Sequence, residues 1–164
     1  MRVEQVMTRN VMVCSVGDNL NRAAQLMWEN ACGTVAVVSA DGDGTVVGIL
    51  TDRDICMAAY TQGKPLWEIP VSVAMARKVI SCRVGDDLKQ VELLMRENRV
   101  RRLPVLDTYG RLQGIVSIDD LAREAERERM ESGKEGMSLA VAETLAEICR
   151  PRIGREIAEP PRAM

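Results

Sequence analysis

The stretch Gly48-Ile49-Leu50-Thr51-Asp52-Arg53-Asp54 occurs again as Gly114-Ile115-Val116-Ser117-Ile118-Asp119-Asp120. Each copy runs from a glycine through two apolar residues to a hydroxyl residue, and an aspartate follows three positions later. A β-type run precedes each copy, and a helix-like pattern follows it, at residues 55–60 and 121–129. We therefore expect each copy to mark the junction of a strand with a helix.

Each junction allows two interpretations. In the first, Thr51 or Ser117 caps the helix, and Asp54 or Asp120 returns the hydrogen bond as a capping box. In the second, the helix N-terminus binds a phosphate through its free N–H groups and its partial positive charge. The aspartate would then accept hydrogen bonds from the vicinal hydroxyls of a ribose. The local pattern fits both interpretations.

The composition favours a protein with an aliphatic core. The chain of 164 residues is 46% hydrophobic but only 2% aromatic, and its net charge is −2. This length fits one compact domain or two small repeats that share a core. The charge does not indicate the basic face of a nucleic-acid-binding protein, and the apolar runs are too short to span a bilayer. Because the N-terminal residues lack the apolar core of a signal peptide, we expect a cytoplasmic protein without nucleic-acid or membrane partners.

The cysteines are scattered and form no Cys-x-x-Cys pair, and the chain has no histidine. A zinc site is therefore not expected, and catalysis by histidine is excluded. Scattered cysteines in a cytosolic protein are typical of small buried apolar residues, and we expect that role here. The five cysteines are Cys14, Cys32, Cys56, Cys82 and Cys149.

A tandem repeat extends over most of the chain. Residues 7–30 align without a gap with residues 75–98, and the match continues to the duplicated junctions. The first repeat carries two extra residues, which fit the Gly-rich turn at 41–44 because turns absorb insertions at low cost. A repeat of this length predicts two similar supersecondary units packed together.

Each repeat shows the order β-α-β-β-α, which predicts an α/β (α+β) fold. A short β segment comes first, at residues 11–14 and 79–82. A helix follows, and Asp18 and Asp86 are its expected N-caps. The expected buried strands are 35–38 and 103–106, and residues 69–72 link the two repeats.

The chain changes character after the second junction. Residues 124–131 are densely charged, which predicts a solvated helix extension. Residues 132–136 resemble a break, and residues 138–148 carry apolar side chains at the spacing of a short amphipathic helix. From Pro151 onward we expect a mobile tail. The predicted organisation is repeat one at 1–68, repeat two at 69–130, and a C-terminal helix with its tail at 131–164.

The chain resembles a tandem pair of CBS domains, the unit often called a Bateman module, of the stand-alone bacterial type. The resemblance covers about residues 1–125, and it is specific because an ordered set of motifs occurs in duplicate. It implies two β-α-β-β-α units related by a pseudo-two-fold axis, with a C-terminal helical extension, and pairing into a homodimer. The motifs that carry it are Val6-Met7-Thr8, Val16-Gly17-Asp18-Asn19-Leu20, Val100-Arg101-Arg102-Leu103-Pro104-Val105-Leu106-Asp107 and the two junction stretches.

The resemblance also implies a function. Clefts between the repeats of CBS pairs commonly bind adenosine-containing ligands such as AMP, ADP, ATP, NAD or S-adenosylmethionine. The hydroxyl reaches ribose or phosphate and the aspartate holds the ribose hydroxyls, roles that fall here to Thr51 with Asp54 and to Ser117 with Asp120. The opening segment of the opposite repeat usually holds the base. The resemblance indicates Val71, Met75, Ala76 and Val100 for the Thr51 cleft, and Val3, Met7, Thr8 and Cys32 for the Ser117 cleft.

The two clefts differ in their basic residues. In the family, phosphates often meet a basic residue at the position of Arg102, and Arg101 shares that neighbourhood. Repeat one has Gly33 and Thr34 there, so that only Arg53 within its own motif could compensate. The clefts are therefore chemically unequal. An alternative for the cluster is a solvated face paired with Glu92 and Glu97, formed by Arg96, Arg99, Arg101 and Arg102.

We expect a regulatory module, not an enzyme, that binds an adenosine nucleotide of the AMP, ADP or ATP class and needs no further cofactor. Binding would shift a conformational equilibrium and signal to an effector protein. The alternatives are a structural dimer with vestigial clefts and a sensor of NAD or S-adenosylmethionine. In an enzyme, Asp52 and Asp54, or Asp119 and Asp120, could hold Mg²⁺ and a phosphate. The chain has no Walker-type loop and no obvious activated nucleophile, which disfavours that class.

Overall fold

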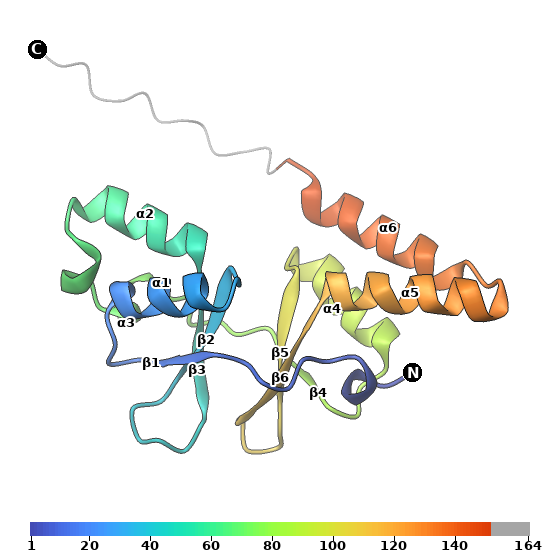
Figure 1. The fold of residues 1–164 in the computed structure, drawn as a ribbon, viewed down its shortest axis with the longest axis horizontal. Helices are drawn as coiled ribbons and strands as arrows, with labels where there is room; N and C mark the ends of the chain where they lie inside the picture. Colours follow the sequence, from blue (N-terminus) through green and yellow to red (C-terminus); the bar gives the residue numbers. More distant parts are fainter. Residues whose placement is uncertain (152–164) are drawn as a thin grey trace, which may run out of the picture.

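Two units of three strands each lie side by side in the computed structural model, which describes residues 1–151 (Figure 1). Repeat one contains β1 (Val13–Ser15), α1 (Leu20–Glu29), β2 (Thr34–Val38), β3 (Val46–Thr51) and α2 (Asp52–Gln62). Repeat two contains β4 (Cys82–Arg83), α4 (Leu88–Asn98), β5 (Arg102–Leu106), β6 (Leu112–Ser117) and α5 (Ile118–Ser132). The other elements are η1 (Val3–Gln5), η2 (Leu66–Glu68), α3 (Val71–Ala74) and the C-terminal α6 (Gly136–Cys149). The predicted β-α-β-β-α order is confirmed in both repeats, whereas the tail predicted after Pro151 lies outside the described residues.

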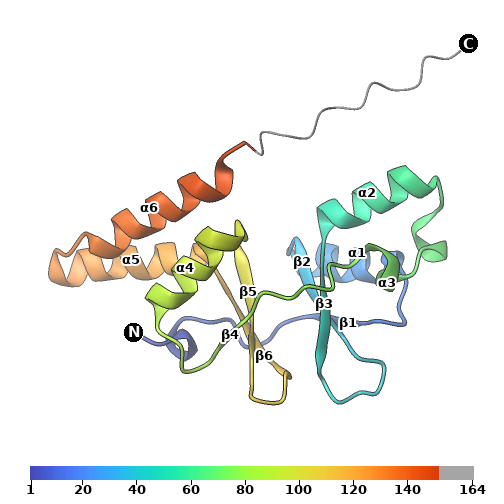
Figure 2. The same ribbon diagram turned by 180° about the vertical axis from the view of Figure 1, so that it is seen from behind.

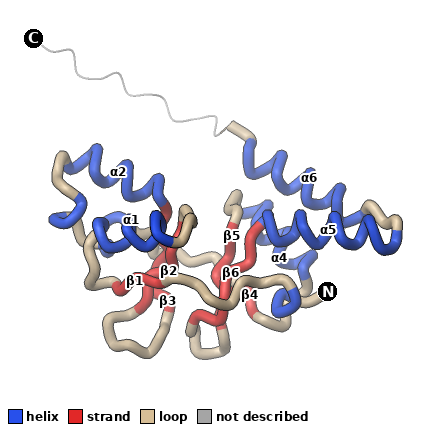
Figure 3. The backbone as a smooth tube through the Cα atoms, viewed as in Figure 1, coloured by secondary structure: helices blue, strands red, loops and turns tan. Residues whose placement is uncertain are grey.

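The two sheets have the same topology and the same register. In each sheet the first strand pairs in parallel with the second, and the second pairs antiparallel with the third. Thr34 lies opposite Thr51, and Arg102 lies opposite Ser117. The strands occupy the middle of the molecule and the helices lie toward its two ends (Figure 3). The duplicated sequence therefore folds into a duplicated sheet.

The opening segment of each repeat crosses to the other repeat. Thr8 exchanges two backbone hydrogen bonds of 2.9 Å with Ile115 of β6, and Ala76 exchanges bonds of 2.9 and 3.0 Å with Ile49 of β3. The blue N-terminal segment is seen passing between the units in Figure 1, and the green linker that follows α3 is seen passing back in Figure 2. The third strand of each sheet thus pairs with a segment of the opposite repeat.

Each repeat has its own core cluster, and the crossing segments complete both. The cluster of repeat one includes Ile69, Val71 and Met75 from the linker, and the cluster of repeat two includes Val3 and Met7 from the N-terminal segment. The remaining members are mainly aliphatic, as the absence of phenylalanine predicts. The expectation of a shared core is wrong, because each crossing segment buries its side chains within the opposite unit.

The helix N-caps lie one residue later than predicted. Asn19 caps α1 and Asp87 caps α4, each through its side-chain oxygen. Asp18 and Asp86 instead each accept a hydrogen bond of 2.8 Å from a backbone N–H three residues earlier. The prediction of these two aspartates as caps is wrong, because their carboxylates turn back to the end of the preceding strand. Strands β1 and β4 also begin later than the predicted segments.

Helix α6 packs against α4 and α5 of repeat two. Arg96 of α4 lies 3.3 Å from the carboxylate of Glu143, and Arg99 lies 2.8 Å from that of Glu147. The alternative that these two arginines pair with acids of their own helix is therefore wrong, because α6 supplies the carboxylates. The predicted helix over 138–148 is confirmed.

Two acidic side chains of repeat two are nearly buried. The wholly buried Thr144 donates its hydroxyl to the carboxylate of Glu92, which is 9% exposed. Glu124 is 8% exposed and accepts hydrogen bonds of 2.9 and 2.7 Å from Arg127. The prediction of a solvated helix over 124–131 is wrong at its beginning, because α6 packs along α5 and a charge-assisted pair satisfies the carboxylate.

The cysteines divide into buried and exposed residues. Cys14 and Cys82 are buried as expected and Cys32 is half-buried, whereas Cys56 on α2 and Cys149 on α6 are exposed. The expectation of burial is therefore wrong for the last two. Burial raises the pKa of the Cys14 thiol to about 11 and that of the Cys82 thiol to about 12. Both thiols are therefore protonated at neutral pH.

Candidate functional site

Both duplicated junctions form a capping box. The backbone N–H and the hydroxyl of Thr51 donate to Oδ2 of Asp54 at 2.9 and 2.6 Å, and the N–H of Asp54 donates to the Thr51 hydroxyl at 3.2 Å. Ser117 and Asp120 repeat the three bonds at 2.8, 2.6 and 3.2 Å. The capping interpretation is confirmed in both repeats. Each box uses only Oδ2 of its aspartate, so the second carboxylate oxygen is left for another contact.

That second oxygen distinguishes the two junctions. Asp120 is 6% exposed, and its Oδ1 pairs with the guanidinium of Arg123 one turn along α5. The equivalent position after Asp54 is Met57, which cannot form an ion pair. Asp54 is partly exposed, and its bonds within residues 1–151 involve Oδ2 alone. Sequence reasoning missed Arg123, although an acid and an arginine three residues apart on a helix are a recognisable pair.

The glycine that begins each motif lets the crossing segment lie against the strand. A Cβ atom at Gly114 would lie 2.6 Å from the carbonyl oxygen of Thr8. A Cβ atom at Gly48 would lie 2.6 Å from Sδ of Met75 and 3.2 Å from the carbonyl oxygen of Ala76. Distances below 3.0 Å are not found for real Cβ atoms. The opposite repeat therefore requires glycine at position 114, where the close atom is backbone, and favours it at position 48, where the close atom belongs to a flexible side chain. The sequence pattern alone did not reveal this.

The structure brings the predicted opening segments to the strands that end in the motifs. Thr8 and Ala76 are exposed there, and the methionines that precede them are nearly buried. Val3 and Val71 are wholly buried in the cores, so their side chains offer no surface to a ligand. The crossing thus places backbone and methionine atoms of each repeat next to the other repeat's motif strand, and their contact with a base stays a prediction.

Arg101 and Arg102 lie at the second junction. Arg102 is opposite Ser117 in the sheet, and its guanidinium is 3.9 Å from the carboxylate of Asp119. The carbonyl of Arg101 accepts a hydrogen bond of 2.9 Å from the N–H of Ile118. Both arginine side chains are exposed. Within residues 1–151, Arg102 thus forms its ion pair with an acid of the second motif. A contact of Arg101 or Arg102 with a phosphate stays a prediction.

Repeat one has no basic residue at the places equivalent to Arg101 and Arg102. A Cβ atom at Gly33 would lie 2.9 Å from Oδ2 of Asp52. The neighbouring Thr34 is uncharged, so Arg53, exposed in the first turn of α2, is the only basic residue of the first motif. The two remaining predicted contacts are half-buried against the core of their own repeat, namely Cys32 and Val100.

The first N–H groups of α2 are already bonded. The N–H of Asp52 donates to the carbonyl of Gly33 at 3.2 Å, and the N–H of Arg53 donates to Oδ1 of Asp52 at 2.7 Å. Together with the capping bond of Asp54, these contacts engage the donors that the sequence assigned to a phosphate. Within the described part of the chain, no three acidic or cysteine side chains are arranged to hold a metal ion. The groups left for a ligand at this junction are Oδ1 of Asp54, Oδ2 of the exposed Asp52 and the Arg53 side chain.

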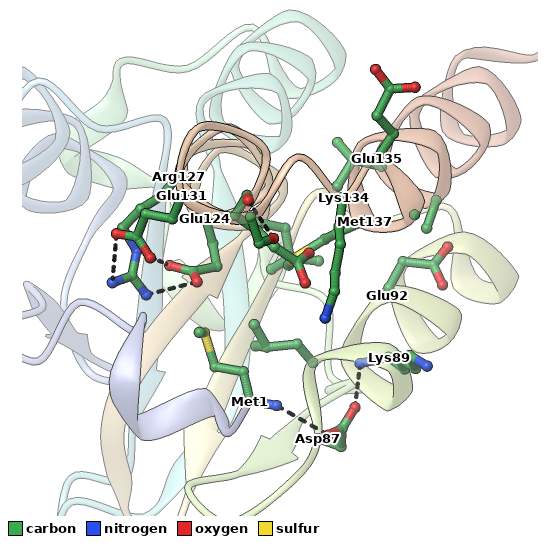
Figure 4. Close-up of a pocket in the computed structure, with 17 residues that line it drawn as sticks. Met1, Asp87, Lys89, Glu92, Glu124, Arg127, Glu131, Lys134, Glu135 and Met137 are labelled. Atoms are coloured by element: carbon green, nitrogen blue, oxygen red, sulfur yellow. Dashed lines mark hydrogen bonds and ion pairs between the residues drawn. The ribbon is translucent and has the colours of Figure 1, made fainter.

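A cavity of about 1010 Å³ lies away from both junctions, between α4, α5 and α6 (Figure 4). Its wall includes the pair of Glu124 with Arg127 and the carboxylate of Asp87, and Lys134 extends into it from the turn before α6. None of the predicted ligand-binding residues lines this cavity. Sequence reasoning did not indicate it, because α6 forms one of its walls only after docking.

Comparison with known proteins agrees with this architecture. The CBS domain family model matches residues 3–60 and again residues 69–127. The CBS domain-containing protein YhcV of Bacillus subtilis is 35% identical over 120 residues, which cover 73% of this chain and 82% of that protein. The structure of the CBS domain protein TA0289 from Thermoplasma acidophilum matches with a TM-score of 0.73 and 26% identity, covering 90% of this chain and 75% of the other.

A further solved structure is the CBS domain pair of protein MJ0100 in complex with 5′-methylthioadenosine and S-adenosyl-L-methionine. It matches with a TM-score of 0.68 and 25% identity, covering 78% of this chain and 98% of the other. The resemblance inferred from the duplicated motifs is thus confirmed by the family match and by the fold. The chain belongs to the CBS domain family, as a tandem CBS pair.

Proposed function

We propose that this CBS pair is a regulatory module that binds an adenosine-containing ligand between its repeats, at the junction of Thr51 and Asp54. The observation that carries the proposal is the crossing of the linker, in which Ala76 pairs with Ile49 only two residues before Thr51. This pairing puts the opening of repeat two beside the helix N-terminus of repeat one. The likeness to the MJ0100 pair, which holds two adenosine compounds, supports the ligand class.

The first junction is preferred because its carboxylate is available. Oδ1 of Asp54 is outside the capping box, whereas the equivalent oxygen of Asp120 is paired with Arg123. In the proposed complex, Asp54 accepts hydrogen bonds from the ribose hydroxyls while it keeps its bonds to Thr51. Because the first N–H groups of α2 are engaged, a phosphate at this site depends on the side chain of Arg53. AMP, ADP and ATP are the ligands proposed first, and NAD and S-adenosylmethionine are the alternatives.

The wider role follows from the family. We infer that the module acts as a homodimer in the cytoplasm, needs no further cofactor, catalyses no reaction, and passes the binding event to an effector protein by a shift in conformation. The division of the chain at residues 68 and 130 belongs to the same proposal. Among residues 1–151, no helix has both the length and the apolar character needed to cross a bilayer.

A second candidate function is a structural dimer with vestigial clefts. The complete capping boxes favour it, because they explain both hydroxyl and aspartate pairs without a ligand. Thermal unfolding with added nucleotides separates the candidates. At a hundredfold excess over Kd, a ligand adds about 2.7 kcal/mol to the free energy of unfolding, so adenosine nucleotides should raise the Tm more than guanosine nucleotides do. Equal shifts for both bases would refute the adenine assignment, and no shift would favour the structural candidate.

Replacement of Asp54 tests the site itself. Asp54→Asn keeps a side-chain oxygen and weakens the cap by about 0.5–1 kcal/mol or less. If Asp54 holds a ribose, charge-assisted hydrogen bonds are lost, and affinity falls by at least about tenfold. Asp120→Asn is the matched control, since it weakens the equivalent cap but should leave affinity nearly unchanged. Isothermal titration that finds unaltered affinity for Asp54→Asn would restrict Asp54 to helix capping.

A further inference from the structure

We propose that the outward face of α6 is a subunit interface that binds the α1–α2 surface of a second copy of this chain. The dimer itself belongs to the function proposed above, but the interface does not depend on nucleotide binding, and the two are tested by different measurements. The outward face of α6 is the apolar stripe formed by Leu139, Ala142, Leu145, Ala146 and Cys149. The α1–α2 surface is formed by Trp28, Met57 and Tyr60.

Helix α6 presents apolar side chains on two sides. Met137, Val141 and Ile148 pack against the core of repeat two, whereas the side chains of the outward stripe are exposed. Glu143 and Glu147 pair with the arginines of α4, and Thr144 is buried against the same helix. On the outward face, Leu139 is 62% exposed and Leu145 is 42% exposed. A surface helix of a lone globular protein is apolar on one side only, and a helix that is apolar on several sides is normally buried. The second apolar side of α6 therefore indicates a further contact on its outward face.

Repeat one exposes three large side chains on its helices. Trp28 near the end of α1 is 88% exposed, Tyr60 on α2 is 80% exposed, and Met57 on α2 is 43% exposed. Tryptophan and tyrosine are the residues most enriched where interfaces draw their binding energy. Within residues 1–151, no helix packs over α1 and α2 as α6 packs over α4 and α5. The helical surfaces of the two repeats thus differ in what covers them.

The repeat alignment indicates which kind of helix face can pack on the helices of each repeat. Trp28 and Ala31 of repeat one align with Arg96 and Arg99 of repeat two. The two arginines hold α6 within the chain by pairing with its carboxylates. Their apolar counterparts cannot form those pairs, so the surface of repeat one matches the apolar face of a helix and not the acidic one.

A second copy is the partner that covers both surfaces at once. The α6 stripe has small side chains at 142 and 146, and the α1–α2 surface has large rings at Trp28 and Tyr60, so the contact would pack large side chains against small ones. If the two α6 stripes packed against each other, the α1–α2 surfaces would stay exposed. If the two α1–α2 surfaces packed against each other, the stripes would stay exposed. Figures 1 and 2 show α2 and α6 along the same edge of the molecule, toward its opposite ends. A two-fold axis between them brings α6 of each copy onto α2 of the other and closes the dimer.

The exposed cysteines allow a direct test, because Cys56 lies on α2 and Cys149 lies on α6. A full-length Cys56→Ser chain and a full-length Cys149→Ser chain are each treated with a short bismaleimide cross-linker, alone and as an equimolar mixture. We expect a covalent dimer in the mixture, with peptide mass spectrometry showing Cys149 joined to Cys56, and little covalent dimer in either chain alone. Cross-links of Cys149 to Cys149, or of Cys56 to Cys56, would overturn the proposal, as would a monomer mass by light scattering at micromolar concentration.

Substitutions on the two surfaces provide a second measurement. Tyr60→Glu and Leu139→Glu should each raise the dimer dissociation constant by at least about 30-fold, because a hot-spot side chain is lost twice per dimer. Tyr109→Glu is the matched control, since Tyr109 is 77% exposed on the β5–β6 turn at the other edge of the molecule. It should change that constant by no more than about threefold. A dimer that is equally stable in all three variants would overturn the proposal.

Discussion

The guanidinium of Arg123 pairs with the buried carboxylate of Asp120 one turn earlier in α5. Repeat one has Met57 at the corresponding place after Asp54, although the capping boxes of the two repeats have nearly equal bond lengths. The ion pair occupies the carboxylate oxygen that a ribose would need. A single residue on each helix therefore decides whether the second carboxylate oxygen is paired at two junctions whose capping boxes are alike.

Exchange of these two residues should exchange the binding properties of the junctions. Met57→Arg places a guanidinium one turn after Asp54, so that affinity for AMP or ATP should fall by at least about tenfold through loss of the acceptor oxygen. Arg123→Met frees the oxygen of Asp120, and the number of nucleotides bound per chain should rise from one to two. Isothermal titration measures both quantities.

The control for that exchange is Arg129→Met, which removes an ion pair with Glu126 on the same helix, away from the junction. It should leave affinity and stoichiometry unchanged. Arg123 is 72% exposed, so its loss should lower the free energy of unfolding by less than about 1 kcal/mol. If Arg123→Met still binds one nucleotide per chain, the ion pair is not what separates the two junctions.

Alanine at the two motif glycines should destabilise the chain to different extents. Gly114→Ala places a Cβ atom against the Thr8 backbone, and we expect a loss of about 1–3 kcal/mol or more in the free energy of unfolding. Gly48→Ala meets mainly the flexible end of Met75, so its loss should be smaller. Gly136→Ala, with no atom within 4 Å of the added group, should not destabilise. Urea unfolding measures all three, and equal losses at Gly48 and Gly114 would contradict this ranking.

The buried bond between α6 and α4 should contribute to stability. Thr144→Val keeps the shape of the side chain but removes the hydroxyl that donates to Glu92. A buried carboxylate without that donor should lower the free energy of unfolding by about 1–3 kcal/mol. Thr144→Ser keeps the donor and serves as the comparison. Equal denaturation midpoints for Thr144→Val and the unsubstituted chain would show that Glu92 does not need this bond.

The buried thiols predict a loss of stability in alkali. Burial raises the pKa of Cys82 from 9.0 to about 12 and that of Cys14 from 9.0 to about 11. Below about pH 9 both thiols are protonated in the folded and unfolded states, so neither contributes a pH dependence. Above it the unfolded chain releases protons that the folded chain retains, so the free energy of unfolding falls as pH rises, by at most about 1.4 kcal/mol per pH unit for each thiol.

Urea unfolding between pH 8 and 10.5 tests this, with Cys82→Ala as the comparison because lysine and tyrosine also titrate in that range. The variant should lose stability less steeply with pH than the unsubstituted chain. Parallel slopes would contradict the burial effect on the Cys82 thiol.

Sequence reasoning succeeded where the signal is local or duplicated. The capping boxes depend on residues three positions apart, so the spacing alone was enough to predict a capping box as one of the two interpretations of each junction, and the structure confirms it. The buried strands and the break before α6 also follow from short patterns. The N-caps at Asn19 and Asp87 were missed by one residue, because two adjacent polar side chains compete for the same donors and only the turn geometry decides between them.

Features that depend on docking could not be read from local patterns. Arg96 and Arg99 find their partners 47 and 48 residues later, on a helix whose position follows from packing. The burial of Glu124 depends on the same helix. At the candidate site, the aspartates and the crossing segments could be predicted from the sequence. The difference between the two aspartates, of which one is paired with Arg123, could be recognised only from the positions of both carboxylate oxygens.

The crossing of the opening segments affects how the chain folds during synthesis. Repeat one can complete its core early, because Ile69, Val71 and Met75 leave the ribosome directly after α2. The N-terminal segment cannot pair with β6 until Ile115 has been synthesised, and before that Val3 and Met7 have no core in which to pack. Its docking is therefore a late step, which joins the two repeats into one cooperative unit. A fragment that ends at residue 68 would lack three core residues of repeat one, and a fragment that begins there would lack two of repeat two.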